Sequence, residues 1–117
     1  MNNEIFDTLR LELRRGCLII AVLAQLRVEH YGYALRKALA EQGMDIDENT
    51  LYPLLRRLES QGLLESTWRE ENKRNKRFYH LSASGEVLLV QLLEEWNAIG
   101  ASLNRIIGGA LISDVAQ

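Results

Sequence analysis

The sequence predicts a mainly α-helical fold with one small β-hairpin. Four segments space their apolar residues at intervals of three and four, as amphipathic helices do, and the segment before the last of them alternates apolar and polar residues, as strands do. At 117 residues, of which 47% are hydrophobic, the chain has the size and apolar content of one compact domain. We therefore predict a single domain without internal repeats.

The first predicted helix runs from Glu4 to Arg27 and is interrupted only by Gly16. Residues 17–26 are apolar except for Gln25, which predicts a central helix that is buried on nearly all sides. The lone Cys17 lies in this run and has no partner for an internal disulfide. We interpret it as a small buried hydrophobic residue in a reducing compartment.

Two shorter helices are predicted next. The first covers Tyr31–Gln42, where apolar side chains recur with helical spacing. The second runs to about Gln61 and begins at a cap supplied by Asp47 or Asn49, since short side-chain acceptors satisfy the free amides of a first turn. Pro53 favours the start near Asn49, because proline is best tolerated near the first turn of a helix.

An antiparallel hairpin is predicted after the third helix. Leu64–Arg69 and Arg77–Ser82 alternate apolar and polar residues, and the polar stretch Glu70–Lys76 separates them. Trp68 falls on the same side of the first strand as Leu64, so we interpret its side chain as packing the hairpin onto the core.

The last helix is predicted over residues 83–108, with Ser82 or Ser84 as its cap. It carries a long and wide apolar stripe, made by Leu89, Leu92, Leu93, Trp96, Ile99, Gly100, Leu103, Ile106 and Ile107. One small domain cannot cover both this stripe and the apolar first helix, so we predict a homodimer related by a twofold axis. Residues 109–117 are predicted to form a disordered tail.

The order of three helices, a hairpin and a further helix predicts a winged helix-turn-helix plus a C-terminal dimerisation helix. We assign residues 1–82 to a DNA-binding domain that includes the N-terminal helix, and residues 83–108 to dimerisation. On a helical wheel the leucines of the third helix share one face, and Asn49, Pro53 and Arg56 lie opposite. Such side chains read base edges or phosphates in a major groove; the alternative is an ordinary solvated surface.

Charge supports nucleic-acid binding although the formal net charge is −2. Residues 50–82 hold seven basic and four acidic side chains, whereas the segments before and after them are net acidic. A cationic hairpin tip neutralises phosphates and gains affinity from counterion release; its alternative is a solvated turn. The predicted DNA-binding residues are Asn49, Thr50, Tyr52 and Arg56 of the helix and Lys73, Arg74, Lys76 and Arg77 of the hairpin.

Several motifs in the chain resemble those of the PadR family of bacterial transcriptional regulators, in order and in spacing. They are Tyr31–Tyr33, Thr50–Glu59, Gly62–Leu63, Arg77–Ser82 and Gly85, and together they span nearly the whole chain. A single C-terminal helix is similar to the short PadR subgroup. The resemblance implies that the first and last helices build the dimer, and that the third helix and the hairpin, or wing, contact DNA.

Trp96 is similar in position to a tryptophan that, in multidrug-responsive members of this family, flanks a pocket at the dimer centre. The resemblance therefore implies a small aromatic or multidrug-like ligand, because an indole stacks on flat or cationic molecules. The alternative is an aromatic anchor of the dimer interface, which needs no ligand. If a pocket exists, its predicted walls are Cys17, Ile20, Ala21, Leu92, Leu93 and Gly100.

Catalysis has little support in the sequence. His30 and His80 are far from the cysteine and from any carboxylate cluster, and neither follows a metal-binding spacing. We predict no enzyme activity, no cofactor and no metal; with no apolar run of membrane-spanning length and no leader, the expected location is the cytoplasm. The predicted function is a homodimeric repressor that binds a double-stranded DNA operator and is released by an aromatic effector. The alternative is a winged-helix protein-interaction module that dimerises without binding DNA.

Overall fold

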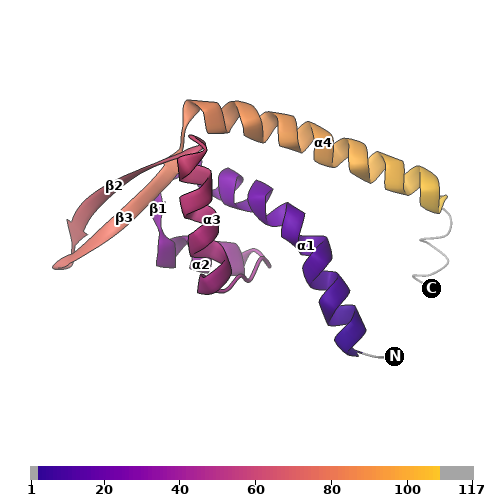
Figure 1. The fold of residues 1–117 in the computed structure, drawn as a ribbon, viewed down its shortest axis with the longest axis horizontal. Coiled ribbons are helices and arrows are strands. Elements are labelled where there is room, and N and C mark those ends of the chain that lie inside the picture. Colours follow the sequence, from indigo (N-terminus) through magenta and orange to yellow (C-terminus); the bar gives the residue numbers. More distant parts are fainter. Residues whose placement is uncertain (1–2, 109–117) are drawn as a thin grey trace.

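The computed structural model describes residues 3–108, and it confirms a mainly helical fold with a small antiparallel sheet. The predicted tail lies outside the described residues. The helices are α1 (Asn3–Gln25), α2 (Gly32–Glu41), α3 (Glu48–Ser60) and α4 (Ala83–Ile107), and the strands are β1 (His30–Tyr31), β2 (Leu64–Glu71) and β3 (Arg74–Leu81) (Figure 1).

The sheet has three strands in the order β1-β3-β2, so the hairpin prediction missed one strand. In β1, His30 pairs with Tyr79 and Tyr31 pairs with Phe78. Tyr31 has extended backbone angles (φ −87°, ψ 166°), so helix α2 begins one residue later than predicted. Two residues are too few to show an alternating pattern, and β1 forms only because β3 offers it a free edge.

Helix α3 begins at Glu48, because the side chain of Asp47 accepts a hydrogen bond from the backbone N–H of Thr50 at 2.8 Å. The preference for a start near Asn49 is therefore wrong. Pro53 lies inside the helix, in its second turn and on its exposed face.

Helix α4 is capped by Ser82, whose hydroxyl oxygen accepts a hydrogen bond from the backbone N–H of Gly85 at 3.0 Å. The same hydroxyl donates to the carbonyl of Gly62 at 2.7 Å, so one buried side chain ties the end of α3 to the start of α4. This geometry selects Ser82 over the alternative cap Ser84.

The hydrophobic core lies where the helices and the base of the hairpin meet. It consists mainly of leucines on inward faces: Val22, Leu23, Leu26, Leu35, Leu39, Ile46, Leu51, Leu55, Leu58, Leu64, Tyr79, Leu81 and Leu89. Residues 17–21 of α1, Cys17 included, are only half-buried within the single chain. The other elements of the same chain therefore do not bury this helix on nearly all sides, and that prediction depends on a partner.

The outer halves of α1 and α4 extend from the core on the side opposite the hairpin (Figure 1). Both leave large apolar side chains exposed, among them Ile5, Phe6, Leu9, Leu13, Trp96, Ile99, Leu103 and Ile106. Within the described part of the chain no helix is long and apolar enough to cross a membrane.

Candidate nucleic-acid interface

Helix α3 presents two faces, as its leucine spacing predicted. Leu51, Leu55 and Leu58 are buried, whereas Asn49 and Arg56 are exposed on the opposite side. This outward face therefore carries an amide and a guanidinium, the groups that bond base edges or phosphates.

Two predicted residues of α3 lie at the edge of this outward face. Tyr52 is half-buried, and its ring packs so closely on the start of α2 that a Cβ atom at Gly32 would lie 2.7 Å from its Cε1 atom. Thr50 is exposed and lies on the side of α3 that faces α1. Tyr52 thus spaces α2 from α3, and its side chain is only partly accessible.

The tip of the wing, the β2–β3 hairpin, is a tight turn. Asn72 and Lys73 both have positive φ angles, 54° and 65°, as the turn of a two-residue hairpin requires. The side chains of Lys73 and Arg74 are exposed and form no ion pair with other residues between 3 and 108. These two cations are therefore available to an external anion.

The other two predicted wing cations have partners within the chain. The Nζ atom of Lys76 lies 3.2 Å from Glu71 and 4.2 Å from the centre of the Tyr31 ring. Burial alone would lower the pKa of Lys76, but its interactions with Glu71 and Tyr31 outweigh this and raise the pKa above its usual value. Lys76 therefore stays protonated, and its charge lies against Glu71 and Tyr31.

Arg77 connects the wing to α3. Its Nη2 atom lies 2.6 Å from Oε1 of Glu59, and its Nε donates to the hydroxyl of Ser66 at 3.0 Å. That hydroxyl in turn donates to the second carboxylate oxygen of Glu59. Burial raises the pKa of neighbouring Tyr79, although the charges of Arg77 and Arg56 oppose the shift, so its phenol is uncharged at neutral pH.

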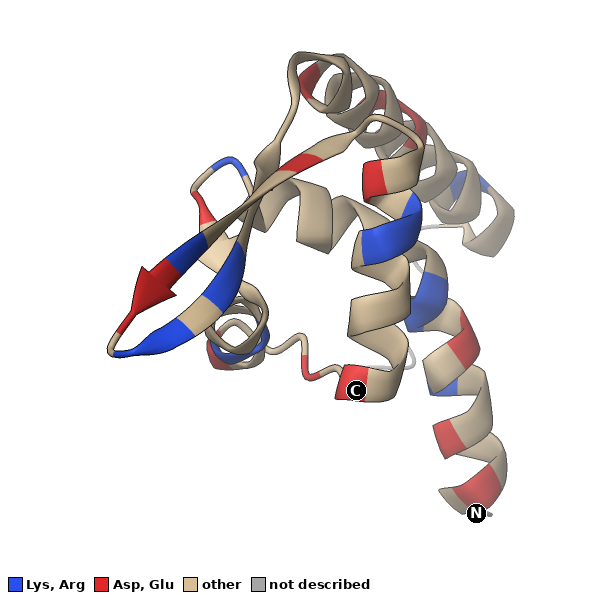
Figure 2. Cartoon of the chain, turned by 60° about the vertical axis from the view of Figure 1, so that its left-hand side comes forward, with Lys and Arg blue, Asp and Glu red and all other residues tan. Residues whose placement is uncertain are grey.

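In Figure 2 basic segments follow β3 from the tip of the hairpin, and another lies in the middle of α3. Acidic segments mark the end of β2, the start of α3 and the outer part of α1. The wing therefore carries a net positive charge, and α3 adds Arg56 and Arg57 between the acidic residues Glu48 and Glu59 at its two ends.

Trp68 contradicts the prediction that it packs the wing onto the core, because its side chain is 65% exposed. It pairs across the hairpin with Arg77, whose guanidinium lies 5.7 Å from the indole centre. Alternation placed Trp68 on the correct side of the strand, but not beyond the end of the core.

A pocket of about 480 Å³ lies between α1 and α4. Of the predicted effector residues, Cys17, Ile20, Leu92, Trp96 and Gly100 line it, whereas Ala21 and Leu93 do not. The pocket is apolar except for the carboxylate of Glu95, and the Trp96 side chain is 54% exposed.

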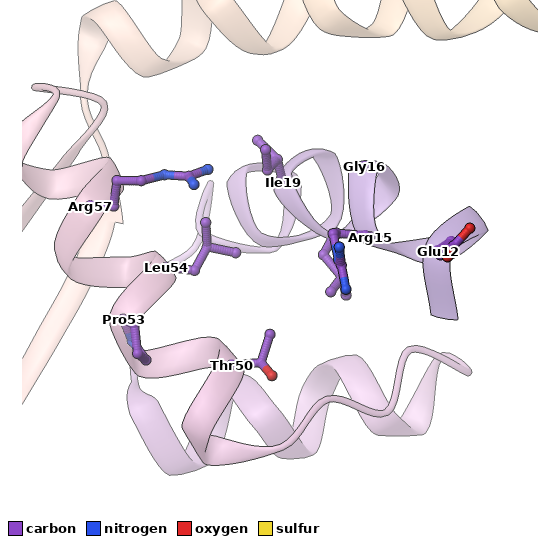
Figure 3. Close-up of a pocket in the computed structure, with 9 residues that line it drawn as sticks. Glu12, Arg15, Gly16, Ile19, Thr50, Pro53, Leu54 and Arg57 are labelled. Carbon is purple, nitrogen blue, oxygen red and sulfur yellow. The ribbon is translucent and has the colours of Figure 1, made fainter. Parts of the chain in front are cut away.

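A second pocket, of about 610 Å³, lies between α1 and α3. In Figure 3, Thr50, Leu54 and Arg57 project from α3, and Arg15 and Ile19 from α1. The sequence did not single out Arg57, because a helical wheel places it on the flank of the outward face.

Residues 19–91 match the profile of the transcriptional regulator PadR-like family. A crystal structure of a PadR-family transcriptional regulator from Eggerthella lenta superimposes with a TM-score of 0.87 at 42% identity, over 90% of this chain and 94% of that one. A PadR-like transcription factor from Bacteroides fragilis gives a TM-score of 0.71 at 29% identity, over 85% and 98%. The transcriptional regulator Rv3488 of Mycobacterium tuberculosis is 33% identical over 81 residues, which cover 69% of this chain and 73% of that protein.

Proposed function

Because this chain belongs to the PadR-like family of transcriptional regulators, we propose that it acts in the cytoplasm as a homodimeric repressor of a double-stranded DNA operator. The family consists of DNA-binding regulators and not of enzymes. The repressor role, the dimer and an effector that releases the DNA go beyond membership of the family and are our proposal.

The main support for a DNA interface is that two of the four wing cations are unpaired and the other two are paired. Lys73 and Arg74 are exposed without an internal partner, while Lys76 and Arg77 are paired to residues of the wing and of α3. We assign Lys73 and Arg74 to phosphate contacts and the other two to holding the wing in place, next to the DNA. A charged tip on a rigid hairpin loses little conformational entropy when it binds.

Helix α3 supplies the base-reading groups in this proposal. Asn49 and Arg56 enter the major groove, where an arginine bonds guanine with two hydrogen bonds and an amide bonds adenine. Thr50 and the accessible part of Tyr52 contact the flanking sugar-phosphate backbone. Two copies of α3 in a twofold dimer then read the two halves of a near-palindromic operator.

Exposed apolar surface supports the dimer. The outer halves of α1 and α4 would leave Phe6, Leu9, Ile99 and Leu103 in water in a lone chain. Apolar surface on two adjoining helices favours a self-complementary interface. Sedimentation at micromolar concentration is expected to give twice the mass of the chain, and a single-chain mass would contradict the dimer.

The pocket between α1 and α4 supports the effector part. Trp96 offers an aromatic face and Glu95 a negative charge, so the pocket suits a flat aromatic molecule, neutral or cationic. The ligand changes DNA affinity only if it binds two dimer geometries unequally. Release of operator DNA by such a compound, lost in Trp96→Ala, is the expected result; a compound that binds equally well to Trp96→Ala would contradict this site.

The test of DNA binding is fluorescence anisotropy with duplex DNA from upstream of the protein's own gene and a scrambled duplex, over a range of salt concentrations. The triple variant Arg56→Glu, Lys73→Glu, Arg74→Glu is expected to lose binding. The control Arg27→Glu changes an exposed charge in the turn after α1, outside α3, the wing and the outer halves of α1 and α4, and is expected to retain it. Equal affinity of the triple variant and the native protein would favour the protein-interaction module instead.

A further inference from the structure

We propose that Trp68 is a DNA-contacting residue whose indole packs on the deoxyribose rings of the operator, between the groove occupied by α3 and the phosphates at the wing tip. This inference rests on the proposed DNA-binding function and adds an apolar contact to its polar ones.

The register of the hairpin places Trp68 on the side of the wing that is turned toward α3. Trp68 lies directly opposite Arg77, and the next pair on the same face is Ser66 with Tyr79. Both Arg77 and Ser66 are hydrogen-bonded to Glu59 of α3, which fixes the direction of this face. Trp68 is one step farther along β2 than Ser66, level with Arg77.

The side chain of Trp68 is not needed for folding. The side chain is 65% exposed and is not part of the core cluster, which the leucines of α3 and the base of the hairpin complete. Its indole N–H has no hydrogen-bond partner among residues 3–108. A large apolar ring with a free donor is the kind of side chain that becomes buried on binding.

The position of Trp68 favours DNA as the partner. Arg77 lies 5.7 Å from the ring and is already ion-paired to α3. The register puts Glu70 next on the face of Trp68 and Arg74 on the other face, so the unpaired cations of the wing are those at its tip, where Lys73 lies in the turn. A deoxyribose offers an apolar face between two phosphates, so the indole covers the sugar while the tip cations meet the phosphates.

The experiment uses the full chain with Trp96→Phe, which leaves Trp68 as the only tryptophan. Operator DNA is expected to protect Trp68 from acrylamide quenching. Separately, Trp68→Ala is expected to lower operator affinity about tenfold, the effect of removing a well-buried apolar contact, without changing the slope of log affinity against log salt. Thr67→Ala, on the opposite face of the same strand, is the matched control and is expected to bind like the native protein.

The variants must share the native melting temperature, which the exposure of both side chains predicts. If the native protein binds DNA but Trp68 stays open to acrylamide and Trp68→Ala binds normally, the inference is wrong while the proposed function stands. If Trp68→Ala changes the salt slope by about 1.8, as loss of one phosphate contact in each wing of the dimer would, the assignment to the sugar is wrong. If the native protein binds no DNA, the proposed function itself fails.

Discussion

Replacing Arg77 by glutamine separates a cation that holds the wing from one that binds DNA. Its side chain is 34% exposed and that of its partner Glu59 is 25% exposed, with 2.6 Å between the nearest atoms. Two unit charges about 4 Å apart attract by roughly 4 kcal/mol at a near-surface dielectric constant of about 20. Partial solvent exposure and desolvation reduce this, so Arg77→Gln is expected to lower the free energy of unfolding by about 1–2 kcal/mol.

Urea denaturation measures this loss. The double variant Arg77→Gln, Glu59→Gln is expected to be less destabilised than the sum of the single variants, with a coupling energy of about 1 kcal/mol. Lys73→Gln removes an exposed cation of the same wing and is expected to change stability by less than about 0.5 kcal/mol. A coupling energy near zero would show that the contact between Arg77 and Glu59 contributes nothing to stability.

Salt-dependent DNA binding gives the second half of the test. Each phosphate contact contributes about 0.9 to the slope of log affinity against log salt, so Lys73→Gln in a dimer with two wings is expected to reduce the slope by about 1.8. Arg77→Gln is expected to weaken binding with the slope unchanged, because the wing loses its position and not a phosphate contact. A reduced slope for Arg77→Gln together with an unchanged slope for Lys73→Gln would refute the roles that we assign to these two cations.

Four further variants test the fold and the charge state. Gly85→Ala is expected to lower the free energy of unfolding by at least about 2 kcal/mol, because its Cβ would lie 2.2 Å from the carbonyl oxygen of Leu63; native-like urea unfolding would contradict this. Asp47→Ala is expected to cost about 1 kcal/mol through loss of the cap, and Asn49→Ala much less; equal losses would argue against the cap. Burial raises the pKa of Tyr79, so stability is complete below the ordinary tyrosine pKa of about 10 and falls as the pH rises through the folded-state pKa. Tyr79→Phe is expected to reduce this alkaline loss, and an unchanged pH profile of unfolding would exclude Tyr79 as its source.

The architecture was predictable where a periodic pattern is long enough to be recognised. Each of the four helices and each strand of the hairpin is at least eight residues long, and their apolar residues follow a clear period. Strand β1 has only two residues, and its existence depends on a partner that lies far away in the sequence. The cap of α3 was ambiguous because Asp47 and Asn49 have similar intrinsic preferences, and only the hydrogen-bond geometry distinguishes them.

The sequence was enough to place the charged and polar residues of the candidate site on α3 and the wing, but not to find their partners within the chain. Lys73, Arg74, Lys76 and Arg77 look alike in the sequence. The pairing of β2 with β3 brings Lys76 to Glu71, and the packing of the wing on α3 brings Arg77 to Glu59. Trp68 was misplaced for a related reason. Alternation gives the side of a strand, whereas the length over which a core covers that side depends on tertiary packing.

The network that joins Glu59, Ser66 and Arg77, together with the pairing of β1 with β3, makes the wing and α3 one stiff unit attached to the end of α1. The described chain is 55 Å along its longest axis, so this unit lies far from the outer ends of α1 and α4. A rotation of roughly 5° at the α1–α4 junction moves a point about 30 Å away by about 2.6 Å, close to the 3.4 Å rise of one base pair. In the proposed dimer, a slight change of helix angle would therefore be enough to put the two α3 helices out of phase with successive grooves, without altering either one.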